Sequence, residues 1–425
     1  MRRKKKNYTP PPSGSRVSPV NPRMQAQLQS AASAFREAMK TGHFQDARKH
    51  CESVLALTPG NPSVMGDYAL TLMRCGEYQH AWKIYTRMFR HQHQQQFQGN
   101  WLDGLAEVCG WLGKKDELRY YGHYALSKAD QQCGGGKKYP LPSERPPRFS
   151  PSQYNVIAFS LYGNHPRYCE TMVKNAELAP DIYPGWHLRV YHDDTVPGHV
   201  LTRLRRMNVE LVDMTGTANI VPTMWRFLVL DDPQVIRYLV RDADALLSEK
   251  ESAAVTEWLG SGTWFHHMRD YFTHTELLLA GMWGGHGGVF PSVSELIREF
   301  LQTYKGTPRY TDQQFLRQIL WPTVRTSLYN HDEIFRFGQA HPYPPSRQER
   351  WSTEAFHIGS NAAYTALGGK VTSPGVRQVA IEFSAEGDVI RYPAEVRGGQ
   401  WSLPVPFFLA DACQNGVLQV NVVAD

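Results

Sequence analysis

The sequence contains no long apolar segment, and this absence narrows the kinds of protein that it can encode. No stretch approaches the roughly 20 apolar residues that a membrane-spanning helix needs. The first residues are basic, so they lack the apolar core of a secretory signal peptide. We therefore expect a cytoplasmic protein without a transmembrane segment.

Cysteine is scarce and scattered. The chain has 6 cysteines in 425 residues, and no two of them form a C-x-x-C pair. A disulfide framework or a zinc ribbon would need closely spaced cysteines. The pattern therefore indicates free thiols in a reducing compartment.

The sequence also lacks motifs that mark several common enzyme classes. It has no G-x-S-x-G elbow, no G-x-x-x-x-G-K-[ST] phosphate loop, and no G-x-G-x-x-G after its first predicted strand. His266, His267 and His274 lie close together, but not at the spacing of a zinc hydrolase. Serine hydrolysis, P-loop chemistry, dinucleotide binding and zinc hydrolysis are therefore unsupported.

Net charge is small outside the N-terminus. The formal charge is +6, and the basic residues at positions 2–6 supply five of these charges. The rest of the chain is close to neutral, which argues against a nucleic-acid-binding face. Residues 1–24 are basic and proline-rich, so we expect a disordered tail. Weak attachment of this tail to an anionic membrane surface is the alternative.

The composition supports folded domains, since 41% of the residues are hydrophobic and 12% are aromatic. Residues 25–132 are predicted to be helical, with a 34-residue period that resembles tetratricopeptide repeats. Such repeats usually bind proteins, although packing support for the next domain is an equal alternative. A Gly- and Pro-rich linker is predicted at 133–150. The repeating positions are Gly42 and Gly76, Phe44 and Tyr78, and Ala47 and Ala81.

Residues 151–370 alternate between predicted strands and helices. VIAFSLYG, WHLRVYHDD and VELVDM read as strands, and helical segments separate them. This alternation predicts an α/β fold with a doubly wound, largely parallel sheet. Residues 371–425 are β-rich, and we expect them to form a small appended unit.

The most informative stretch is VIRYLVRDADALLS, residues 235–248. Its apolar, β-branched run ends in Asp242 and Asp244. We interpret it as a buried strand that delivers two carboxylates to the carboxyl edge of the sheet, where open α/β sheets bind ligands. Carboxylate oxygens suit a hard divalent cation. The alternative is an Asp-rich turn with no ligand.

Several short motifs around this strand follow the order of a known family. Arg226 lies in MWRF before RYLVRDADALL, and LLLAGMWGG, TDQQFL and FHIGS follow. On these motifs, the region from about Tyr154 to Tyr364 resembles GT-A-fold glycosyltransferases, particularly the glycogenin-like family 8 group. HHMRD, AGMWG and YTDQQFL also resemble a set of uncharacterised bacterial and viral proteins of the RDxDS type.

The resemblance implies a GT-A-like mixed sheet that transfers a sugar, with retention, from a nucleotide-diphosphate sugar to a glycan or protein acceptor. It implies that Asp242, Asp244 and His357 hold Mn²⁺ or Mg²⁺. It places Asp312 and Gln313 beside the donor sugar as catalytic residues. The donor-binding residues that it implies are Arg226, Arg269, Asp270, Gly281, Trp283 and Gly284.

One departure from the family leaves choices open. SNAAY, residues 360–364, stands where the family has a lysine that contacts the donor phosphate, so Arg226, Arg347 or Arg350 could take that contact. A non-catalytic scaffold, whose repeats bind a partner protein, is the rival interpretation. Nucleotidyl transfer is a further alternative, but the expected lysine-containing loop after the first strand is missing.

Overall fold

The computed structural model describes residues 22–94, 97, 99–217, 219–306, 310–351, 356–371, 375–385 and 388–424. The expected tail lies outside the described residues up to residue 21, and helix α1 begins at Pro22. The chain divides into two compact units, residues 1–113 and 114–425. Among the helices of the described residues, none is both long and apolar enough to cross a membrane.

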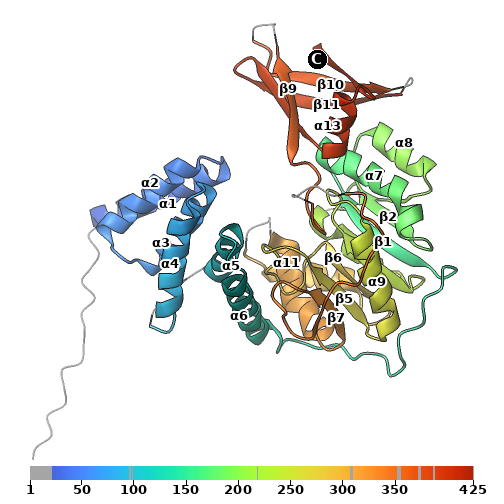
Figure 1. Ribbon diagram of the computed structural model, residues 1–425, viewed down its shortest axis with the longest axis horizontal. Helices are drawn as coiled ribbons and strands as arrows, with labels where there is room; N and C mark the ends of the chain where they lie inside the picture. Colours follow the sequence, from blue (N-terminus) through green and yellow to red (C-terminus); the bar gives the residue numbers. More distant parts are fainter. Residues whose placement is uncertain are drawn as a thin grey trace, which may run out of the picture. The chain divides into compact units, whose positions relative to one another are not determined.

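The first unit is made of helices (Figure 1). The glycines at the 34-residue period have equivalent places, since Gly42 and Gly76 both adopt positive φ, 75° and 80°, in short turns between helices. The repeating Ala47 and Ala81 are both fully buried. The period therefore corresponds to repeated helix pairs, and a tetratricopeptide identity stays a prediction. The helices are α1 (Pro22–Lys40), α2 (Phe44–Leu57), α3 (Pro62–Arg74), α4 (Tyr78–His91) and α5 (Trp101–Trp111).

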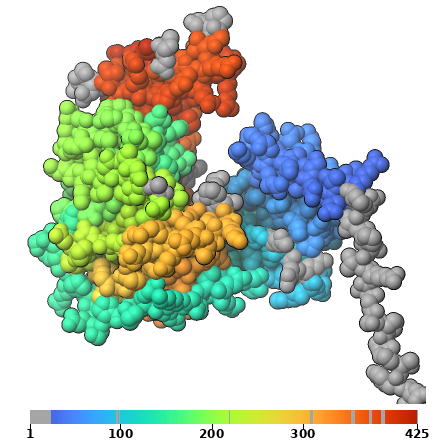
Figure 2. All heavy atoms as spheres, turned by 180° about the vertical axis from the view of Figure 1, so that it is seen from behind, coloured from blue at the N-terminus to red at the C-terminus, as the bar shows by residue number. Residues whose placement is uncertain are grey.

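Helix α6 (Lys115–Cys133) belongs to the second unit, although the sequence grouped it with the repeats. Its Leu126 and Ala129 lie in the core of that unit, and Asp130 accepts a hydrogen bond from Trp321 Nε1 at 2.7 Å. The predicted linker that follows runs over the surface of the second unit (Figure 2). It is held there by contacts such as Tyr139 N to Thr323 Oγ1 at 2.9 Å. The division between units therefore falls about 20 residues before the Gly/Pro-rich segment.

An eight-stranded mixed sheet forms the centre of the second unit, in the order β3-β2-β1-β4-β6-β5-β7-β8. All neighbouring strands are parallel except β6, which runs antiparallel to β4 and β5. This confirms the predicted α/β class with a mixed sheet. The strands are β1 (Asn155–Leu161), β2 (His187–His192), β3 (Glu210–Asp213), β4 (Arg237–Arg241), β5 (Phe265–Arg269), β6 (Met282–His286), β7 (Leu328–Asp332) and β8 (Ala340–His341).

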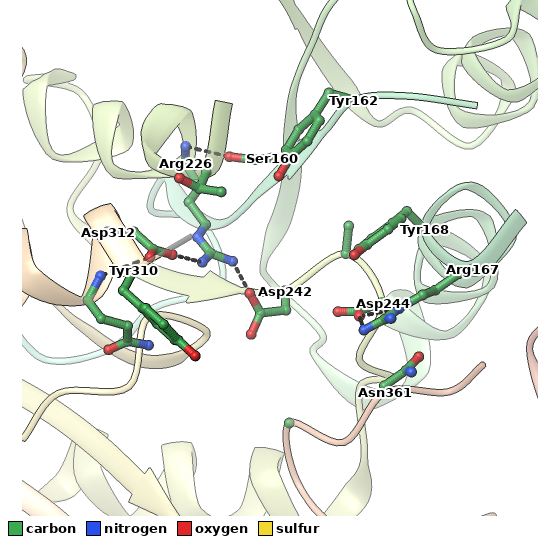
Figure 3. A pocket seen from close by; sticks show the side chains of 14 residues that line it. Ser160, Tyr162, Arg167, Tyr168, Arg226, Asp242, Asp244, Tyr310, Asp312 and Asn361 are labelled. Atoms are coloured by element: carbon green, nitrogen blue, oxygen red, sulfur yellow. Dashed lines mark hydrogen bonds and ion pairs between the residues drawn. The ribbon is translucent and has the colours of Figure 1, made fainter. Parts of the chain in front are cut away.

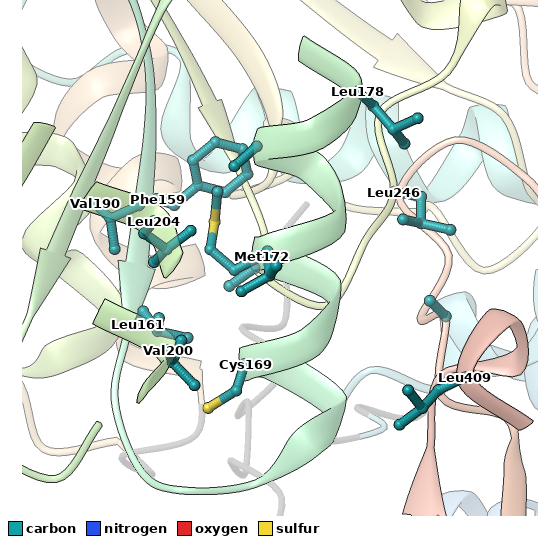
Figure 4. Packing of buried hydrophobic residues seen from close by; sticks show 14 of the residues in the cluster. Phe159, Leu161, Cys169, Met172, Leu178, Val190, Val200, Leu204, Leu246 and Leu409 are labelled. Carbon is teal, nitrogen blue, oxygen red and sulfur yellow. The ribbon is translucent and has the colours of Figure 1, made fainter. Parts of the chain in front are cut away.

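Helices connect and cover these strands. They include α7 (Pro166–Ile182), α8 (Gly198–Arg206), a 3₁₀ segment η1 (Pro222–Asp231), α9 (Glu249–Ser261), α10 (Val293–Thr303), α11 (Thr311–Phe315), a π-helical turn (Leu316–Leu320) and α12 (Trp321–Val324). Figure 4 shows α7 between two apolar layers. Its Met172 and Cys169 face β1 on one side, and Leu409 of the C-terminal part lies on the other.

The C-terminal residues form a five-stranded antiparallel sheet, ordered β13-β10-β11-β12-β9. This confirms the predicted small β unit. Tyr392 donates a hydrogen bond to buried Glu170 of α7 at 2.5 Å, and Glu170 also pairs with Arg203 at 2.8 Å. The elements are β9 (Thr365–Lys370), β10 (Gln378–Ala385), β11 (Asp388–Arg397), β12 (Gln400–Val405), α13 (Phe407–Gln414) and β13 (Gln419–Ala424).

Candidate functional site

The candidate site lies where the strand order of the sheet reverses. The chain runs from β1 outward to β2 and β3, and then returns to place β4 on the other side of β1. Such a reversal opens a crevice at the carboxyl ends of the two central strands. A cavity of about 470 Å³ lies there. Its lining residues are Ser160, Tyr162, Arg167, Tyr168, Thr223, Arg226, Asp242, Ala243, Asp244, Tyr310, Asp312, Gln313, Gly359 and Asn361.

Strand β4 delivers both predicted carboxylates to this cavity. All five residues of β4 are buried, and the strand ends at Arg241, so the chain leaves the core at Asp242. The side chain of Asp242 is 39% exposed, whereas that of Asp244 is 14% exposed. The sequence interpretation of this stretch as a buried strand with two carboxylates at its carboxyl end agrees with this arrangement.

Arg226 joins two carboxylates that come from distant elements. It lies on η1 and is 5% exposed. Its Nη1 pairs with Asp242 and donates to the Arg241 carbonyl at 3.0 Å, and its Nη2 lies 3.3 Å from Asp312 Oδ2. Figure 3 shows the guanidinium between the two carboxylates. Because a guanidinium is planar and always charged, it fixes the separation of Asp242 and Asp312.

Asp244 has an arginine partner of its own. Arg167, in the first turn of α7, donates from Nε to Asp244 Oδ2 at 2.7 Å (Figure 3). The segment that leads to the C-terminal sheet holds the same loop, since Ala362 N donates to the Asp244 carbonyl at 2.8 Å. Gly359 and Asn361 of that segment line the cavity. The site therefore combines the start of α7, the end of β4 and the segment before β9.

The electrostatics of the cavity favour a cation. Burial raises the pKa of Asp244, and the charge of Asp242 adds to this effect while Arg167 opposes it. Burial likewise raises the pKa of Asp312, Arg226 opposes this, and Asp242 adds to it. The lining carries three carboxylates and two guanidinium groups. A bound cation would offset the remaining negative charge and the repulsion among the carboxylates.

The oxygen atoms that these carboxylates offer fit a hard divalent cation in part. The pairs with arginine use Oδ1 of Asp242 and Oδ2 of Asp244, so the other oxygen of each carboxylate faces no arginine. Mg²⁺ is commonly held by one or two carboxylates while water and substrate phosphates complete its ligands. Among the residues that the structure describes, no group of three or more His, Cys, Asp and Glu side chains is placed to hold a metal ion.

His357, the third ligand implied by the family resemblance, lies outside the lining of the cavity. Its ring stacks on Tyr271 with a centroid distance of 4.0 Å, and its Nδ1 lies 3.0 Å from the Ile358 carbonyl. His274 packs edge-on against the same ring at 5.1 Å. His357 therefore packs in an aromatic stack with Tyr271 and His274, apart from the Asp pair.

The residues implied in donor binding separate into two sets. Arg226 lines the cavity, and a Cβ placed on Gly281 would lie 2.0 Å from Asp242 Oδ2, so this glycine adjoins the site. Arg269 lies elsewhere because it is 1% exposed and donates to the Glu276 and Leu277 carbonyls, both at 2.8 Å.

The other three implied donor residues have packing contacts. Asp270 pairs with Lys250 and accepts from Ile358 N at 3.0 Å. Trp283 is fully buried, and a Cβ on Gly284 would lie 2.5 Å from the Tyr238 carbonyl. The structure therefore places Asp270, Trp283 and Gly284, like Arg269, outside the lining of the cavity.

Asp312 and Gln313 both line the cavity, and their catalytic roles stay a prediction. The Gln313 amide, in the orientation that satisfies both of its neighbours, donates to the Leu278 carbonyl and accepts from Ala280 N, each at 3.0 Å. These bonds tie α11 to the loop before β6. The other arginines predicted as contacts for the donor phosphate are Arg347 and Arg350. Both pair with Asp181, and Arg350 also pairs with Glu249 at 2.6 Å.

Sequence reasoning missed several residues that line the cavity. Ser160, Tyr162, Arg167 and Tyr168 all belong to the end of β1 or to the loop and helix turn that follow it. The signal was available, because every segment that follows a parallel strand opens on the same edge of the sheet. Tyr310 opens the YTDQQFL motif, whereas Asn361 carries no comparable signal.

No protein-family model matches the sequence, and no curated protein matches it. Among solved structures, a Thermobaculum terrenum O-GlcNAc transferase mutant is 17% identical over 52% of this chain and 46% of that chain, with a TM-score of 0.28. The mannosyltransferase PcManGT from Pyrobaculum calidifontis, in complex with GDP-Man and Mn²⁺, is 12% identical over 55% and 67%, with a TM-score of 0.29.

A third solved structure is glucosyl-3-phosphoglycerate synthase from Mycobacterium tuberculosis, in complex with Mg²⁺ and uridine diphosphate. It is 10% identical over 44% of this chain and 74% of that chain, with a TM-score of 0.27. This chain therefore spans about half of the first structure, the O-GlcNAc transferase. At these TM-scores, the solved structures carry no argument for function, so the function proposed below depends on the site and on the sequence motifs.

Proposed function

We propose that this chain is a metal-dependent glycosyltransferase that moves a sugar from a nucleotide-diphosphate donor to a glycan or protein acceptor. The observation that carries the proposal is the pair Asp242 and Asp244 beside a 470 Å³ cavity at the switch point of the sheet. The cavity has the size of a ligand site, about 300–1,000 Å³. Retention of configuration and a protein-binding repeat module follow from resemblance and belong to the same proposal.

In this proposal, Asp242 and Asp244 hold Mn²⁺ or Mg²⁺. The metal supplies Lewis acidity that neutralises charge on the departing diphosphate. Arg226 holds the Asp242 carboxylate in place, and Arg167 does the same for Asp244. Asp312, fixed by Arg226, accepts hydrogen bonds from hydroxyls of the donor sugar.

The tyrosines of the cavity give it walls that suit a nucleotide donor. Tyr162, Tyr168 and Tyr310 line it, and each is partly exposed, at 40%, 37% and 50%. Aromatic rings bury large apolar areas while their hydroxyls reach polar groups. The chain thus supplies apolar walls for a base or a sugar face, and charged groups for the diphosphate.

A non-catalytic scaffold remains the second candidate, and one observation favours it. Asp242 and Asp244 each already have an arginine partner, so the cluster is partly satisfied without a metal. In a purely structural cluster, those pairs would persist and no cation would bind.

Mn²⁺ binding separates the two candidates. We expect the wild-type chain to bind Mn²⁺ in an electron paramagnetic resonance titration, and to release nucleotide from one member of a panel of UDP- and GDP-sugars. Asp242→Asn should reduce both by about 100-fold or more, as expected for loss of an electrostatic contact to the transition state. The exposed Asp411→Asn is the matched control. Absence of Mn²⁺ binding and of nucleotide release would leave the scaffold as the better description.

A further inference from the structure

A second cavity, of about 440 Å³, lies in the part of the sheet that is remote from the carboxylates. Thr263 lies two residues before β5, and Ser327 directly precedes β7, so the cavity opens at the amino ends of these parallel strands. Asp242 and Asp244 follow the carboxyl end of β4 at the opposite edge. The residues of this second cavity that carry the argument are Asp130, Trp321, Arg325, Thr326, Phe337 and Gln339.

The charged groups of this amino-edge cavity neutralise each other. Arg325 Nη2 lies 2.8 Å from Asp130 Oδ2, and the described lining contains no other charged side chain. A phosphate would need an excess of positive charge, and a divalent cation would need an excess of carboxylates. The amino-edge cavity therefore favours a neutral ligand, unlike the carboxylate cavity.

The same ion pair still offers hydrogen-bonding positions. Asp130 Oδ1 accepts from Trp321 Nε1 at 2.7 Å, which holds the carboxylate still. A carboxylate accepts in about four directions and a guanidinium donates five hydrogens, so the pair leaves positions for neighbouring hydroxyls. Gln339 and Thr326 add exposed polar groups at the rim.

Aromatic rings complete the lining. Trp321 and Phe337 lie 6.3 Å apart with an interplanar angle of 29°. Trp321 is 2% exposed and backs the wall, so the partly exposed Phe337 presents most of the aromatic surface to the cavity. A pyranose ring presents apolar C–H faces and a rim of hydroxyls, and both kinds of surface find partners here. Metal ions, phosphates and purely apolar ligands would each leave part of this lining without a partner.

We propose that the amino-edge cavity binds a neutral oligosaccharide. Its role, which depends on the glycosyltransferase proposed above, is to hold a glycan acceptor away from the point of transfer. Binding itself needs neither donor nor metal, so it can be measured whether or not the transferase proposal holds. Tethering at a remote site raises the local concentration of the acceptor chain end.

The experiment titrates the full chain with maltoheptaose, cellohexaose and chitohexaose, without metal or donor, by isothermal titration calorimetry. We expect at least one of them to bind. Thr326→Trp, which adds a bulky ring at an exposed position of the lining, should weaken binding about tenfold or more. Gln339→Ala should weaken it by about threefold or more, the value of one hydrogen bond. The exposed Gln400→Ala is the matched control.

Circular dichroism melting checks that each variant is folded. The proposal is overturned if none of the three sugars binds at millimolar concentration, or if both cavity variants bind as wild type does. It is also overturned if Asp242→Asn removes the binding while Thr326→Trp does not, because the sugar would then occupy the carboxylate cavity. A failure of the transferase proposal appears separately, as absence of Mn²⁺ binding.

Discussion

Arg241 and Asp242 are neighbours in the chain, yet their side chains lie in opposite environments. Arg241 pairs with Glu251 at 3.0 Å, and the two side chains are 3% and 2% exposed. Asp242 pairs with Arg226 but is 39% exposed and faces the cavity. The comparison shows that the role of an arginine–carboxylate pair depends on how far it is exposed. A sealed pair holds the fold together, whereas an open pair leaves a carboxylate oxygen for a ligand.

The largest effect that we expect comes from breaking the sealed pair. Arg241→Met should lower the free energy of unfolding by about 3–5 kcal/mol, because it leaves Glu251 charged, buried and without its guanidinium. Urea denaturation of the full chain measures this change. Arg391→Met, which removes an exposed arginine, should stay within about 0.5 kcal/mol of wild type. Equal midpoints for the two variants would contradict the distinction.

Two nearby glycines, Gly281 just before β6 and Gly284 within it, extend the same contrast to packing. A Cβ on Gly284 would lie 2.5 Å from the Tyr238 carbonyl, so Gly284→Ala must push β6 away from β4. We expect a loss of about 1–3 kcal/mol in unfolding free energy. A Cβ on Gly281 meets mainly the partly exposed Asp242 carboxylate, which can yield only by leaving its pair with Arg226, and lies 3.0 Å from the Asp242 backbone nitrogen. Compared with Gly284→Ala, Gly281→Ala should therefore lower the unfolding free energy less but weaken Mn²⁺ binding more. If Gly284→Ala weakened Mn²⁺ binding more, this would count against the proposed site.

Local sequence patterns could predict the strand and its carboxylates. The β-branched run of β4 and the two aspartates after it are adjacent in the chain, so no long-range contact is needed to place them. The alternation of strands and helices in the second unit is equally local. The mixed α/β sheet and the Asp pair at its edge were therefore accessible from sequence.

Contacts between distant residues were not accessible. Arg167 reaches Asp244 across 77 residues, and its charge alone suggests only a helix surface. From its motif, Arg269 is predicted to bind the nucleotide-sugar donor. In the fold it is buried among backbone carbonyl groups that come together only when the chain folds. Helix α6 follows the repeat pattern but packs on the second unit through Asp130 and Trp321, which are 191 residues apart.

Buried histidines provide a smaller, pH-dependent effect. His266 Nε2 lies 2.8 Å from His331 Nδ1, and His331 Nε2 lies 2.9 Å from Glu257. Burial lowers the pKa of both histidines. Below a pH of about 6.5 the unfolded chain binds protons that the folded chain does not. The free energy of unfolding therefore decreases as the pH is lowered, by up to about 1.4 kcal/mol per pH unit for each such histidine.

Urea denaturation between pH 7.5 and 5.5 tests this slope. In His266→Phe, which keeps a ring against Trp258, the slope at the acid end of this range should fall by about one proton, that is about 1.4 kcal/mol per pH unit. The carboxyls of Asp244 and Asp312 act in the opposite sense, because their raised pKa values make stability fall as pH rises through them. A slope unchanged by the substitution would place the titrating groups elsewhere.

Apart from the exposed control, the smallest stability effect should come from Asp242→Asn, one residue from the largest. The substitution breaks the pair with Arg226, but it also removes a charge that raises the pKa of Asp244 and Asp312. These changes oppose each other at a partly exposed position, so we expect the unfolding free energy to stay within about 1 kcal/mol of wild type.

Titration of the Asp312 carboxyl in Asp242→Asn tests the second part of this argument, the loss of repulsion. The pKa of Asp312, followed by carboxyl ¹³C NMR, should fall in Asp242→Asn as the repulsion is lost. A large loss of stability in Asp242→Asn would mean that the open cluster supports the fold as the sealed pair does. The contrast between Arg241 and Asp242 would then not distinguish a structural charge from a functional one.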